Sequence, residues 1–414
     1  MNAPQPPRTT QVVIAGAGPA GAACAALLAR EGIDVVLLDA QRFPRFKACG
    51  EFMSPQCIPL LEQLGAARAL ERAGARAVRG MELVGHGKRA SGRFVDIGRA
   101  RAPVEHGWAL RREVFDAELV AHARRVGVQV FEGWRVIGVE RAANGSVSGV
   151  LVRGPSGERR AIAADWTIGA DGLRSQVAAE LGVQREDTTL RRIALTTRYR
   201  DVDIGSIAQA HFFEGGYFAL APVDQGLVSV NLVLFEDLYQ REALARDALF
   251  DAWVERIPSV RAALVAGERV DPLRGLGPLA RKTTQQTFDG AALVGDACGY
   301  VDPLTGEGIF FALEGAASLA PALLEALASG RTDRSVLEPY LRARASEVLP
   351  RARVCRWLVH ALARPGLARI LLGLLESRRG LADLAVSLSA DYARPAELLR
   401  PGVWLRAWNG GASA

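Results

Sequence analysis

Three glycines near the N-terminus have the spacing of a phosphate-binding turn. Gly16, Gly18 and Gly21 follow a short apolar run and precede an Ala-rich stretch. At such a turn the first glycine permits a tight bend, the second lets the backbone approach a pyrophosphate, and the third lets the helix pack on the strand. Asp39 ends the next apolar run, where a carboxylate accepts hydrogen bonds from ribose hydroxyls. The pattern predicts a dinucleotide site, and the acid disfavours a 2′-phosphate.

Two later segments contain paired Asp and Gly residues. Residues 167–175 read T-I-G-A-D-G-L-R-S, and residues 293–308 read L-V-G-D-A-C-G-Y-V-D-P-L-T-G-E-G. With these segments the chain resembles the superfamily of FAD-dependent monooxygenases and geranylgeranyl reductases, flavoproteins similar to para-hydroxybenzoate hydroxylase. The glycine turn alone does not choose between NAD and FAD. The resemblance implies bound FAD, with NAD(P)H as a transient electron donor that shares the flavin cleft.

The resemblance also assigns residues of each segment to the flavin. It implies that Asp296 bonds the ribityl chain and that Asp171 and Gly172 organise the region serving FAD and NAD(P)H. Arg112, in the pattern R-x-x-F-D, would contact the pyrophosphate, and the alternative is a solvated arginine on a helix. The expected cofactor-binding residues are Gly16, Gly18, Pro19, Ala20, Gly21, Asp39, Ala40, Lys47, Cys49, Gly50, Arg112, Asp171, Gly172, Gly295, Asp296, Pro303, Gly306, Gly308 and Ile309.

Two partial matches favour the reductase branch of the superfamily. Lys47-Ala48-Cys49-Gly50-Glu51 is similar to the K-x-C-G segment that lies beside the flavin in that branch. Residues 216–222 read G-Y-F-A-L-A-P, with alanine where the branch usually carries an aromatic residue. Flavin halogenases carry W-x-W-x-I-P here, which would require tryptophan at positions 217 and 219. Halogenation is therefore not expected.

The resemblance leaves the reaction open. The first expectation is a monooxygenase that hydroxylates or epoxidises a hydrophobic or aromatic secondary-metabolite-type substrate, for which no fixed catalytic acid is needed. The alternative is hydride transfer to a carbon–carbon double bond of an isoprenoid or polyketide chain, with Cys49 or Tyr217 as the catalytic proton donor. Cys49 has the alternative of a plain buried cysteine. Tyr217, Phe213 and Phe218 either line the substrate pocket or belong to the core. A flavin-binding redox sensor without turnover is the third alternative.

Composition narrows the class of protein further. The 414 residues are 49% hydrophobic and 23% charged, as in globular proteins. The net charge of +6 comes mainly from arginine, without the interleaved basic and aromatic stripe of a nucleic-acid-binding protein. Five cysteines form no CxxC pair, which indicates a reducing cytoplasm, and the five histidines show no metal-ligand spacing. The N-terminus does not read as a signal peptide.

No apolar run is long enough to predict a transmembrane segment. Residues 358–376 are apolar with arginines at intervals. We expect this stretch to pack on its own domain, and the alternative is peripheral contact with a membrane or a cover over an apolar substrate.

The sequence also predicts the strands and helices that hold the glycine turn and the two Asp-Gly segments. Residues 1–10 are expected to be disordered. A strand at 11–15, a helix at 20–31 and a strand at 33–39 predict a parallel βαβ unit. Three runs over 130–165, separated by A-N-G-S and G-P-S-G, predict an antiparallel meander, and a fourth strand at 166–170 returns to the parallel sheet. The other expected elements are an antiparallel sheet over 193–235 joined by a strand at 81–84, a helix at 308–328, and helices over 336–405 broken at Pro350, Pro365 and Pro395.

The expected fold class is α/β: an FAD-binding Rossmann-like parallel sheet with a β-meander, a second antiparallel-sheet substrate domain, and a C-terminal helical cap. The expected bounds are 8–75, 103–182 and 272–330 for a discontinuous FAD-binding domain, 76–102 and 183–271 for the substrate-binding domain, and 331–414 for the C-terminal helical region.

Overall fold

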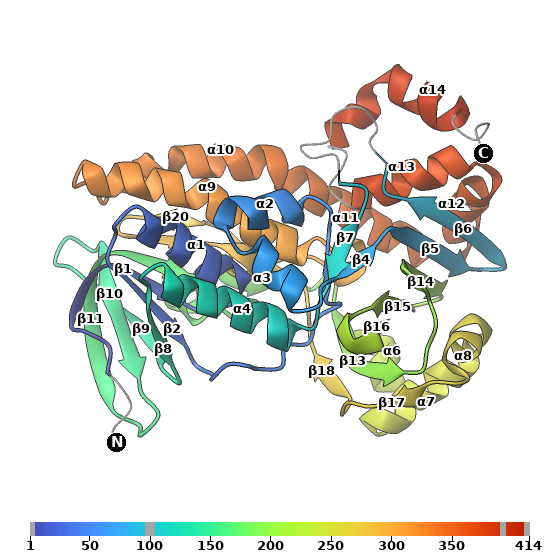
Figure 1. Cartoon of the computed structure of the whole chain (residues 1–414), viewed down its shortest axis with the longest axis horizontal. Helices are drawn as coiled ribbons and strands as arrows, with labels where there is room; N and C mark the ends of the chain where they lie inside the picture. The colour runs from blue at the N-terminus through green and yellow to red at the C-terminus, as the bar shows by residue number, and fades with distance from the viewer. Residues whose placement is uncertain (1–4, 96–103, 390–394, 410–414) are drawn as a thin grey trace.

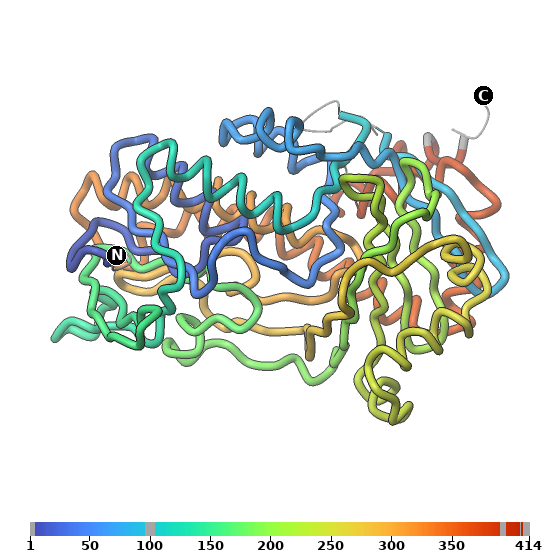
Figure 2. The backbone as a smooth tube through the Cα atoms, turned by 60° about the horizontal axis from the view of Figure 1, so that its bottom comes forward, coloured from blue at the N-terminus to red at the C-terminus, as the bar shows by residue number. Residues whose placement is uncertain are grey.

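The computed structural model describes residues 5–95, 104–389 and 395–409. Figure 1 shows two sheet-containing parts along the long axis, with the C-terminal helices over the end that holds the second sheet. The turned view in Figure 2 shows the same arrangement, with the N-terminal segment at one end and the yellow helices after the second sheet at the other. The mixed α/β architecture with a helical C-terminal region confirms the predicted fold class.

A parallel sheet forms around the glycine turn. β1 (Thr9–Ala15), α1 (Pro19–Arg30) and β2 (Val35–Asp39) make the predicted βαβ unit, although the strand already begins within the segment expected to be disordered. β1 pairs in parallel with β2 and with β11 (Arg159–Gly169), and β2 pairs with β8 (Gln129–Glu132). All five residues of β2 are buried because both faces of the sheet are covered. On the other side, β21 (Ala291–Leu293) pairs with β11 and β20 (Thr287–Phe288) pairs with β21, so that β20 and β8 are the edge strands of this order.

Different elements cover the two faces of this sheet. α1, α4 (Arg112–Arg125) and α9 (Gly308–Ala328) bury one face. β9 (Arg135–Arg141) and β10 (Val147–Arg153) bury the other face, together with the first half of β11.

The meander differs from the prediction in two ways. The run expected over 130–141 breaks at Gly133, whose φ of +81° suits glycine, so that β8 joins the parallel sheet. The third run and the return strand at 166–170 form one strand, β11, which begins in the meander and ends beside β1. Local pattern does not show where one long strand leaves the meander and enters the parallel part of the sheet.

The second large sheet contains the expected antiparallel segments. Its central strands are β13 (Arg192–Arg200), β16 (Val228–Phe235), β15 (Gly216–Pro222) and β14 (Ile207–Phe213). The strand expected at 81–84, β5 (Gly80–Gly85), joins it but pairs in parallel with β14, so the sheet is mixed. Pairing direction was not predictable because the elements from β6 to β13 lie between β5 and β14 in the chain. The outer strands are β6 (Lys88–Arg93), β17 (Glu268–Arg269) and β18 (Arg274–Leu276).

Helices cover the face of the second sheet that carries Phe218 and Leu232. These helices are α6 (Glu236–Arg241), α7 (Arg246–Arg256) and α8 (Pro258–Leu264). The two small sheets contain β3 (Phe52–Met53), β7 (Gly107–Ala109) and β4 (Arg76–Val78), and β12 (Gln184–Glu186), β19 (Arg281–Thr283) and β22 (Gly299–Tyr300). The remaining short helices of these parts are α2 (Cys57–Leu64), α3 (Ala67–Arg72) and α5 (Gln176–Glu180), with 3-10 turns at Asp224–Gly226, Gly295–Cys298, Pro303–Thr305 and Arg334–Leu337.

α9 has the predicted bounds and forms part of the core. It is the one helix of the described residues that has the length and apolar composition to cross a membrane. Twelve of its residues are buried, and it packs against α1 and α10 (Glu338–Glu347). The burial explains its composition, because a helix that is apolar all round is a core helix when protein surrounds it.

The C-terminal helices begin near prolines, at the predicted Pro350 and Pro365 and also at Pro401, whereas the predicted Pro395 begins a 3-10 turn. Prolines stand at the first turns of α11 (Leu349–Leu362), α12 (Pro365–Ser377) and α14 (Pro401–Asn409), where the missing N–H is not needed. A further break separates α13 (Arg379–Ser389) from α12, and a 3-10 turn, η5 (Pro395–Leu399), precedes α14. Only one face of α12 packs on the protein. Ala368 and Leu372 are buried, whereas Leu367, Ile370 and Leu374 are exposed.

The expected domain division stays a prediction, with one bound in conflict with the sheet. β18 lies after residue 271 but pairs with β13 of the second sheet, so a boundary at 271 cuts through that sheet. The boundary expected between 102 and 103, and the end of the helical region at 410–414, lie outside the described residues.

A buried histidine in the second sheet predicts acid sensitivity. His211 is 2% exposed and contacts Ser259 at 2.9 Å and Gln209 at 3.1 Å. Burial, assisted by the charge of Arg89, lowers the pKa of His211 to about 4. Between the unfolded pKa of about 6.5 and this value, His211 is protonated in the unfolded chain but not in the folded chain. The free energy of unfolding therefore decreases as the pH is lowered.

The expected loss is about 3 kcal/mol of unfolding free energy from about pH 7 to about pH 4. Urea unfolding of the wild type and of His211→Gln at both pH values measures it. The variant should lose less stability on acidification by about that amount, and equal losses would remove His211 as the cause.

Candidate active site

A cavity of about 410 Å³ lies where the carboxyl ends of β1, β2 and β11 face the second sheet. Ligands of open α/β sheets bind outside the carboxyl ends of the strands. The three predicted segments converge on this cavity, together with the loop that contains Lys47 and Cys49. Every residue expected to bind the cofactor lines the cavity except Gly21, which lies behind the glycine turn.

The glycine turn is held by close backbone contacts. Gly16 has a φ of +97°, and a Cβ on it would lie 2.5 Å from the carbonyl oxygen of Ala170. A Cβ on Gly21 would lie 1.9 Å from the carbonyl oxygen of Gly16. Gly18 has open space, since the nearest atom to its Cβ would be the Arg45 guanidinium at 3.7 Å. The first and third glycines therefore fix the turn, and the second leaves room for a group in the cavity.

Asp39 is positioned by the same turn. Its Oδ2 accepts a hydrogen bond from the backbone N–H of Ala17 at 2.9 Å, and its Oδ1 accepts one from Gln41 at 2.8 Å. Arg45 Nη2 lies 3.6 Å from Oδ2. Each carboxylate oxygen has a second acceptor site, which suits two ribose hydroxyls.

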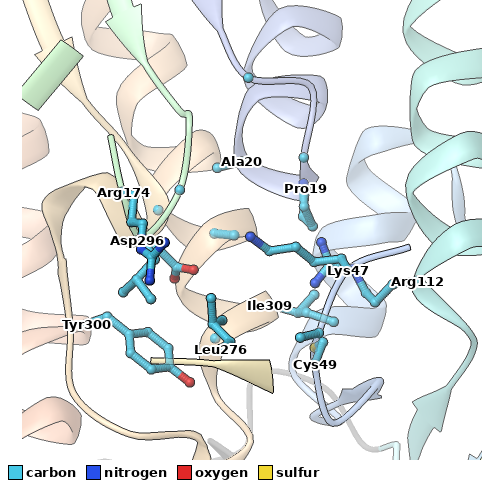
Figure 3. Close-up of a pocket in the computed structure, with 18 of the residues that line it drawn as sticks. Pro19, Ala20, Lys47, Cys49, Arg112, Arg174, Leu276, Asp296, Tyr300 and Ile309 are labelled. Carbon is cyan, nitrogen blue, oxygen red and sulfur yellow. The ribbon is translucent and has the colours of Figure 1, made fainter. Parts of the chain in front are cut away.

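Two opposite charges meet inside the cavity. Figure 3 shows Lys47 extending across it toward Asp296. Burial lowers the pKa of Lys47, and the positive charges of Arg112 and Arg45 add to this whereas Asp296 opposes it. Burial likewise raises the pKa of Asp296, with Lys47 and Arg112 opposing. Both groups are polar and little solvated, so a polar ligand that pairs with them gains strong hydrogen bonds.

Arg112 is buried rather than solvated. Its guanidinium donates to Asp116 at 2.8 and 2.9 Å, and Arg45 also contacts Asp116, at 3.1 Å. Burial disfavours the charge, but the pairing with Asp116 holds the pKa of Arg112 above its usual value. The side chain is 6% exposed and lines the cavity, which excludes the alternative of a surface arginine.

Asp171 joins the second segment to a helix. Its Oδ2 accepts from the backbone N–H groups of Gln176 and Val177 at 2.7 and 3.2 Å, at the start of α5. The Ser175 side chain also hydrogen-bonds this carboxylate, and Oδ1 is buried. Each carboxylate oxygen can accept two hydrogen bonds, so Asp171 keeps acceptor capacity for a ligand in the cavity that it lines.

The third segment brings the N-terminus of α9 to the cavity. Gly308 and Ile309 open the helix and line the cavity. Gly306 has a φ of +69°, and a Cβ there would lie 2.8 Å from the Phe52 ring. The small residues leave space before the helix, whose unpaired N–H groups favour negative charge there.

The opposite wall comes from the second sheet. Tyr217 and Ala219 project into the cavity from β15, whereas the residue between them, Phe218, is fully buried against Phe250 on the other face. Alternation along a strand explains this division. Phe213 stacks on Trp253 at 4.6 Å, so Phe213 and Phe218 belong to the core. The other side chains of this wall are Ala194, Thr196, Asn231, Val233, Leu276 and Leu279.

Tyr217 is bonded to a carboxylate of the chain itself. Its hydroxyl donates to Asp302 Oδ1 at 2.7 Å, and Arg192 Nε lies 3.5 Å from the other oxygen of Asp302. Burial, followed by the charge of Asp302, raises the pKa of Tyr217 well above its usual value. The phenol therefore stays protonated, and its proton points to Asp302.

Cys49 lies at the end of the cavity near the second sheet. Figure 3 shows it beside Ile309 and Arg112, at the same end of the view as Leu276 and the ring of Tyr300, away from Pro19. Its Sγ accepts the backbone N–H of Glu51 at 3.4 Å and is hydrogen-bonded to Arg112. The thiol is partly exposed to the cavity, unlike the four other cysteines, which are buried.

Several polar residues of the cavity were not among those expected from the sequence. They include Tyr300, Thr196 and Asn231, which line it from β22, β13 and β16. Tyr300 lies four residues after Asp296, inside the segment 293–308, so its place at the cavity could have been predicted from that segment. Thr196 and Asn231 are directly paired across β13 and β16, a relation that only strand register reveals.

The residues fit FAD. The glycine turn leaves an open face at Gly18, Asp39 retains acceptor sites beside it, and Asp171 lines the cavity with acceptor capacity to spare. The arginine at position 112 supplies buried positive charge on the same cavity. Asp39 suits an adenosine ribose, the open face at Gly18 together with Arg112 suits a pyrophosphate, and Asp296 and Asp171 suit hydroxyl or N–H donors of the rest of the cofactor.

The sequence comparisons identify relatives. Residues 9–352 match the family model of the FAD binding domain. A menaquinone reductase of Mycolicibacterium smegmatis is 30% identical over 349 residues, which cover 80% of this chain and 79% of the reductase. A flavin-dependent halogenase of Armillaria mellea is 29% identical over 349 residues, which cover 77% of this chain but only 65% of the halogenase.

Solved structures share the fold. The flavin-dependent brominase Bmp2 superposes with a TM-score of 0.82 at 20% identity, covering 96% of this chain and 97% of the brominase. A geranylgeranyl bacteriochlorophyll reductase-like protein of Thermoplasma acidophilum superposes with a TM-score of 0.75 at 23% identity, covering 95% and 98%. The chain thus shares its fold with a brominase and with a reductase-like protein, and the fold alone does not assign a function.

Proposed function

The chain belongs to the FAD binding domain family, within the superfamily of FAD-dependent monooxygenases and geranylgeranyl reductases, and we propose that it reduces a carbon–carbon double bond of a hydrophobic small molecule. An FAD-dependent oxidoreductase is the general class to which its relatives belong. The observation that carries the reductive proposal is the position of the Cys49 thiol, which faces the cavity where the apolar wall of the second sheet begins.

FAD, held by the residues described above, would supply the hydride after its own reduction by NAD(P)H. The wall of Ala194, Ala219, Val233, Leu276 and Leu279 gives an apolar substrate a surface that excludes water. The small side chain of Ala219 leaves room there that an aromatic residue would fill.

Cys49 is the proposed proton donor. As hydride adds to one carbon of the double bond, the Sγ–H bond breaks and the proton adds to the other carbon. The thiolate left behind would be hydrogen-bonded to the Arg112 cation, which stabilises it until water returns the proton. Tyr217 is the weaker candidate because its proton is already donated to Asp302. We assign Tyr217 a positioning role in the wall.

Replacing Cys49 with alanine tests this assignment. Turnover should fall by roughly 10²-fold, the low end of the range for removing a general acid. Bound FAD and substrate KM should change little, since alanine fits the same space. Cys49→Ser, which keeps a weaker donor, should retain an intermediate rate in stopped-flow reoxidation of the reduced flavin by substrate. A variant with alanine that turns over at the wild-type rate would exclude Cys49.

An oxygen-dependent reaction is the second candidate. The halogenase relatives favour it, because their names describe oxidative chemistry. Hydroxylation or epoxidation would use the same apolar wall and needs no acid at position 49. We do not propose halogenation, because Tyr217 and Ala219 stand where that class carries tryptophans.

Oxygen separates the two candidates. Product formation with NADH or NADPH should proceed equally fast in anaerobic and aerobic buffer if the enzyme is a reductase, and the product should gain two hydrogens by mass spectrometry. Product that forms only with oxygen and gains an oxygen atom would replace this proposal by monooxygenation.

A further inference from the structure

The C-terminal helices carry most of the exposed large apolar side chains of the described residues. Outside them only Leu244 and Val265 belong to this group. The others are Leu349 and Trp357 on α11, Leu367, Ile370 and Leu374 on α12, Leu399 in η5, and Trp404, Leu405 and Trp408 on α14. The four tryptophans elsewhere in the chain are buried, whereas these three are 47–57% exposed. Exposed tryptophans on one end of a protein are unusual and mark a contact surface.

These side chains follow helical periodicity. On α12, Leu367, Ile370 and Leu374 share one face, and Ala368 and Leu372 are buried on the other. On α14, Trp404 and Trp408 are four residues apart and lie on one face. α11 contacts both α12 and η5, and α13 joins α12 to α14. Figures 1 and 2 show these red helices gathered at one end of the molecule.

The same segment carries the net positive charge of the protein. Residues 349–409 contain ten arginines and four acidic residues, which accounts for the whole formal charge of +6. Six of these arginines are exposed, and none of the six forms an ion pair with a described residue: Arg353, Arg364, Arg369, Arg378, Arg379 and Arg400. Arg378 instead lies over the Trp408 ring at 4.5 Å. Arginines beside tryptophans at a water-exposed apolar face are suited to lipid headgroups.

We propose that α11, α12, η5 and α14 bind the surface of an anionic phospholipid bilayer. The apolar side chains would enter the boundary between headgroups and acyl chains, and the arginines would pair with the phosphates. A second copy of the chain fits this face less well. In a two-fold dimer the face meets itself, which would bring the six unpaired arginines of each copy together. The family match ends at residue 352, so this surface is not implied by the family.

Vesicle flotation of the full-length protein tests the proposal. The protein should float with vesicles of equal parts phosphatidylcholine and phosphatidylglycerol, less with phosphatidylcholine alone, and less at high salt, because surface charge is screened. Trp404→Ser/Trp408→Ser should weaken binding by about tenfold or more. Arg364→Glu/Arg369→Glu should weaken it by about tenfold or more for the phosphatidylglycerol vesicles.

The matched control is Leu244→Ser/Val265→Ser, which removes exposed apolar side chains outside the surface and should leave flotation unchanged. Melting temperature and bound flavin report that each variant is folded. Two outcomes would overturn the proposal. One is wild-type protein that stays in the soluble fraction with both kinds of vesicle. The other is sedimentation showing a dimer that the tryptophan variant abolishes, with no flotation, which would assign the surface to a second copy.

Discussion

Replacing Gly16 with alanine is expected to abolish FAD binding. The new Cβ would lie 2.5 to 2.7 Å from the backbone of Ala170 and Asp171, where no side-chain movement can relieve the overlap. β1 and β11 would have to separate at the end where the cavity lies. The glycine turn and Asp171 would then lose their relative position. Purified Gly16→Ala should contain no flavin, and titration with FAD should show affinity at least about 10²-fold below wild type.

Gly32→Ala is the matched control for this prediction. Gly32 also has a positive φ, of +81°, but a Cβ there would meet nothing within 4 Å. The control therefore carries the backbone strain of about 1–2 kcal/mol without the overlap. It should be less stable than wild type and still bind FAD. Loss of FAD in both variants would show that strain, not contact with β11, is responsible.

Removal of Arg198 is expected to destabilise the junction between the two sheets by about 3–5 kcal/mol. Arg198, on β13, donates to Glu51 from Nε at 2.9 Å, and it also contacts Glu113 and Asp271 at 2.6 and 2.8 Å. Arg198 and Glu51 are 4% and 2% exposed. In Arg198→Met, Glu51 would be left as a buried carboxylate without its cation. Denaturant unfolding should show the loss.

Two further variants define the cause. Arg200→Ala, two residues along β13, removes an exposed pair with Glu268 and should cost under about 0.5 kcal/mol. Adding Glu51→Gln to Arg198→Met should recover part of the loss, because a neutral amide is cheaper to bury. No recovery would indicate that the alkyl chain of Arg198, rather than its charge, is the main contribution.

The stability lost in Arg198→Met should depend on pH in a definite direction. Burial raises the pKa of Glu51, and the hydrogen bonds of Arg198 oppose this. Without Arg198 the folded-state pKa should rise further. A carboxyl whose folded pKa exceeds its unfolded value is stabilising at low pH, and this stability is lost as pH rises through the folded pKa. The difference in unfolding free energy between wild type and Arg198→Met should therefore be smaller at mildly acidic pH.

Local patterns predicted the parts of the site that lie within one strand, turn or helix. The turn at Gly16, the acid at position 39 and the start of α9 at Gly308 are such features, because spacing alone determines them. The structure also places Arg112 and Cys49 at the cavity, where resemblance had assigned them. Their roles toward FAD remain predictions.

The rest of the site depends on pairings between distant segments. Thr196 and Asn231 face the cavity because β13 and β16 share a register, and Tyr217 is held by Asp302, 85 residues later in the chain. The pairing of Arg198 with Glu51 spans 147 residues. The exposure of Ile370 was likewise not predictable, since periodicity gives the faces of a helix but not which face meets a neighbour.

The flavin content of the purified protein is the most direct test of the account. FAD extracted from the wild type should approach one equivalent per chain, and the spectrum of the folded protein should show bound flavin that NAD(P)H bleaches. A colourless protein that neither contains FAD nor quenches the fluorescence of added FAD would contradict the assignment of the cavity, and with it the proposed reaction.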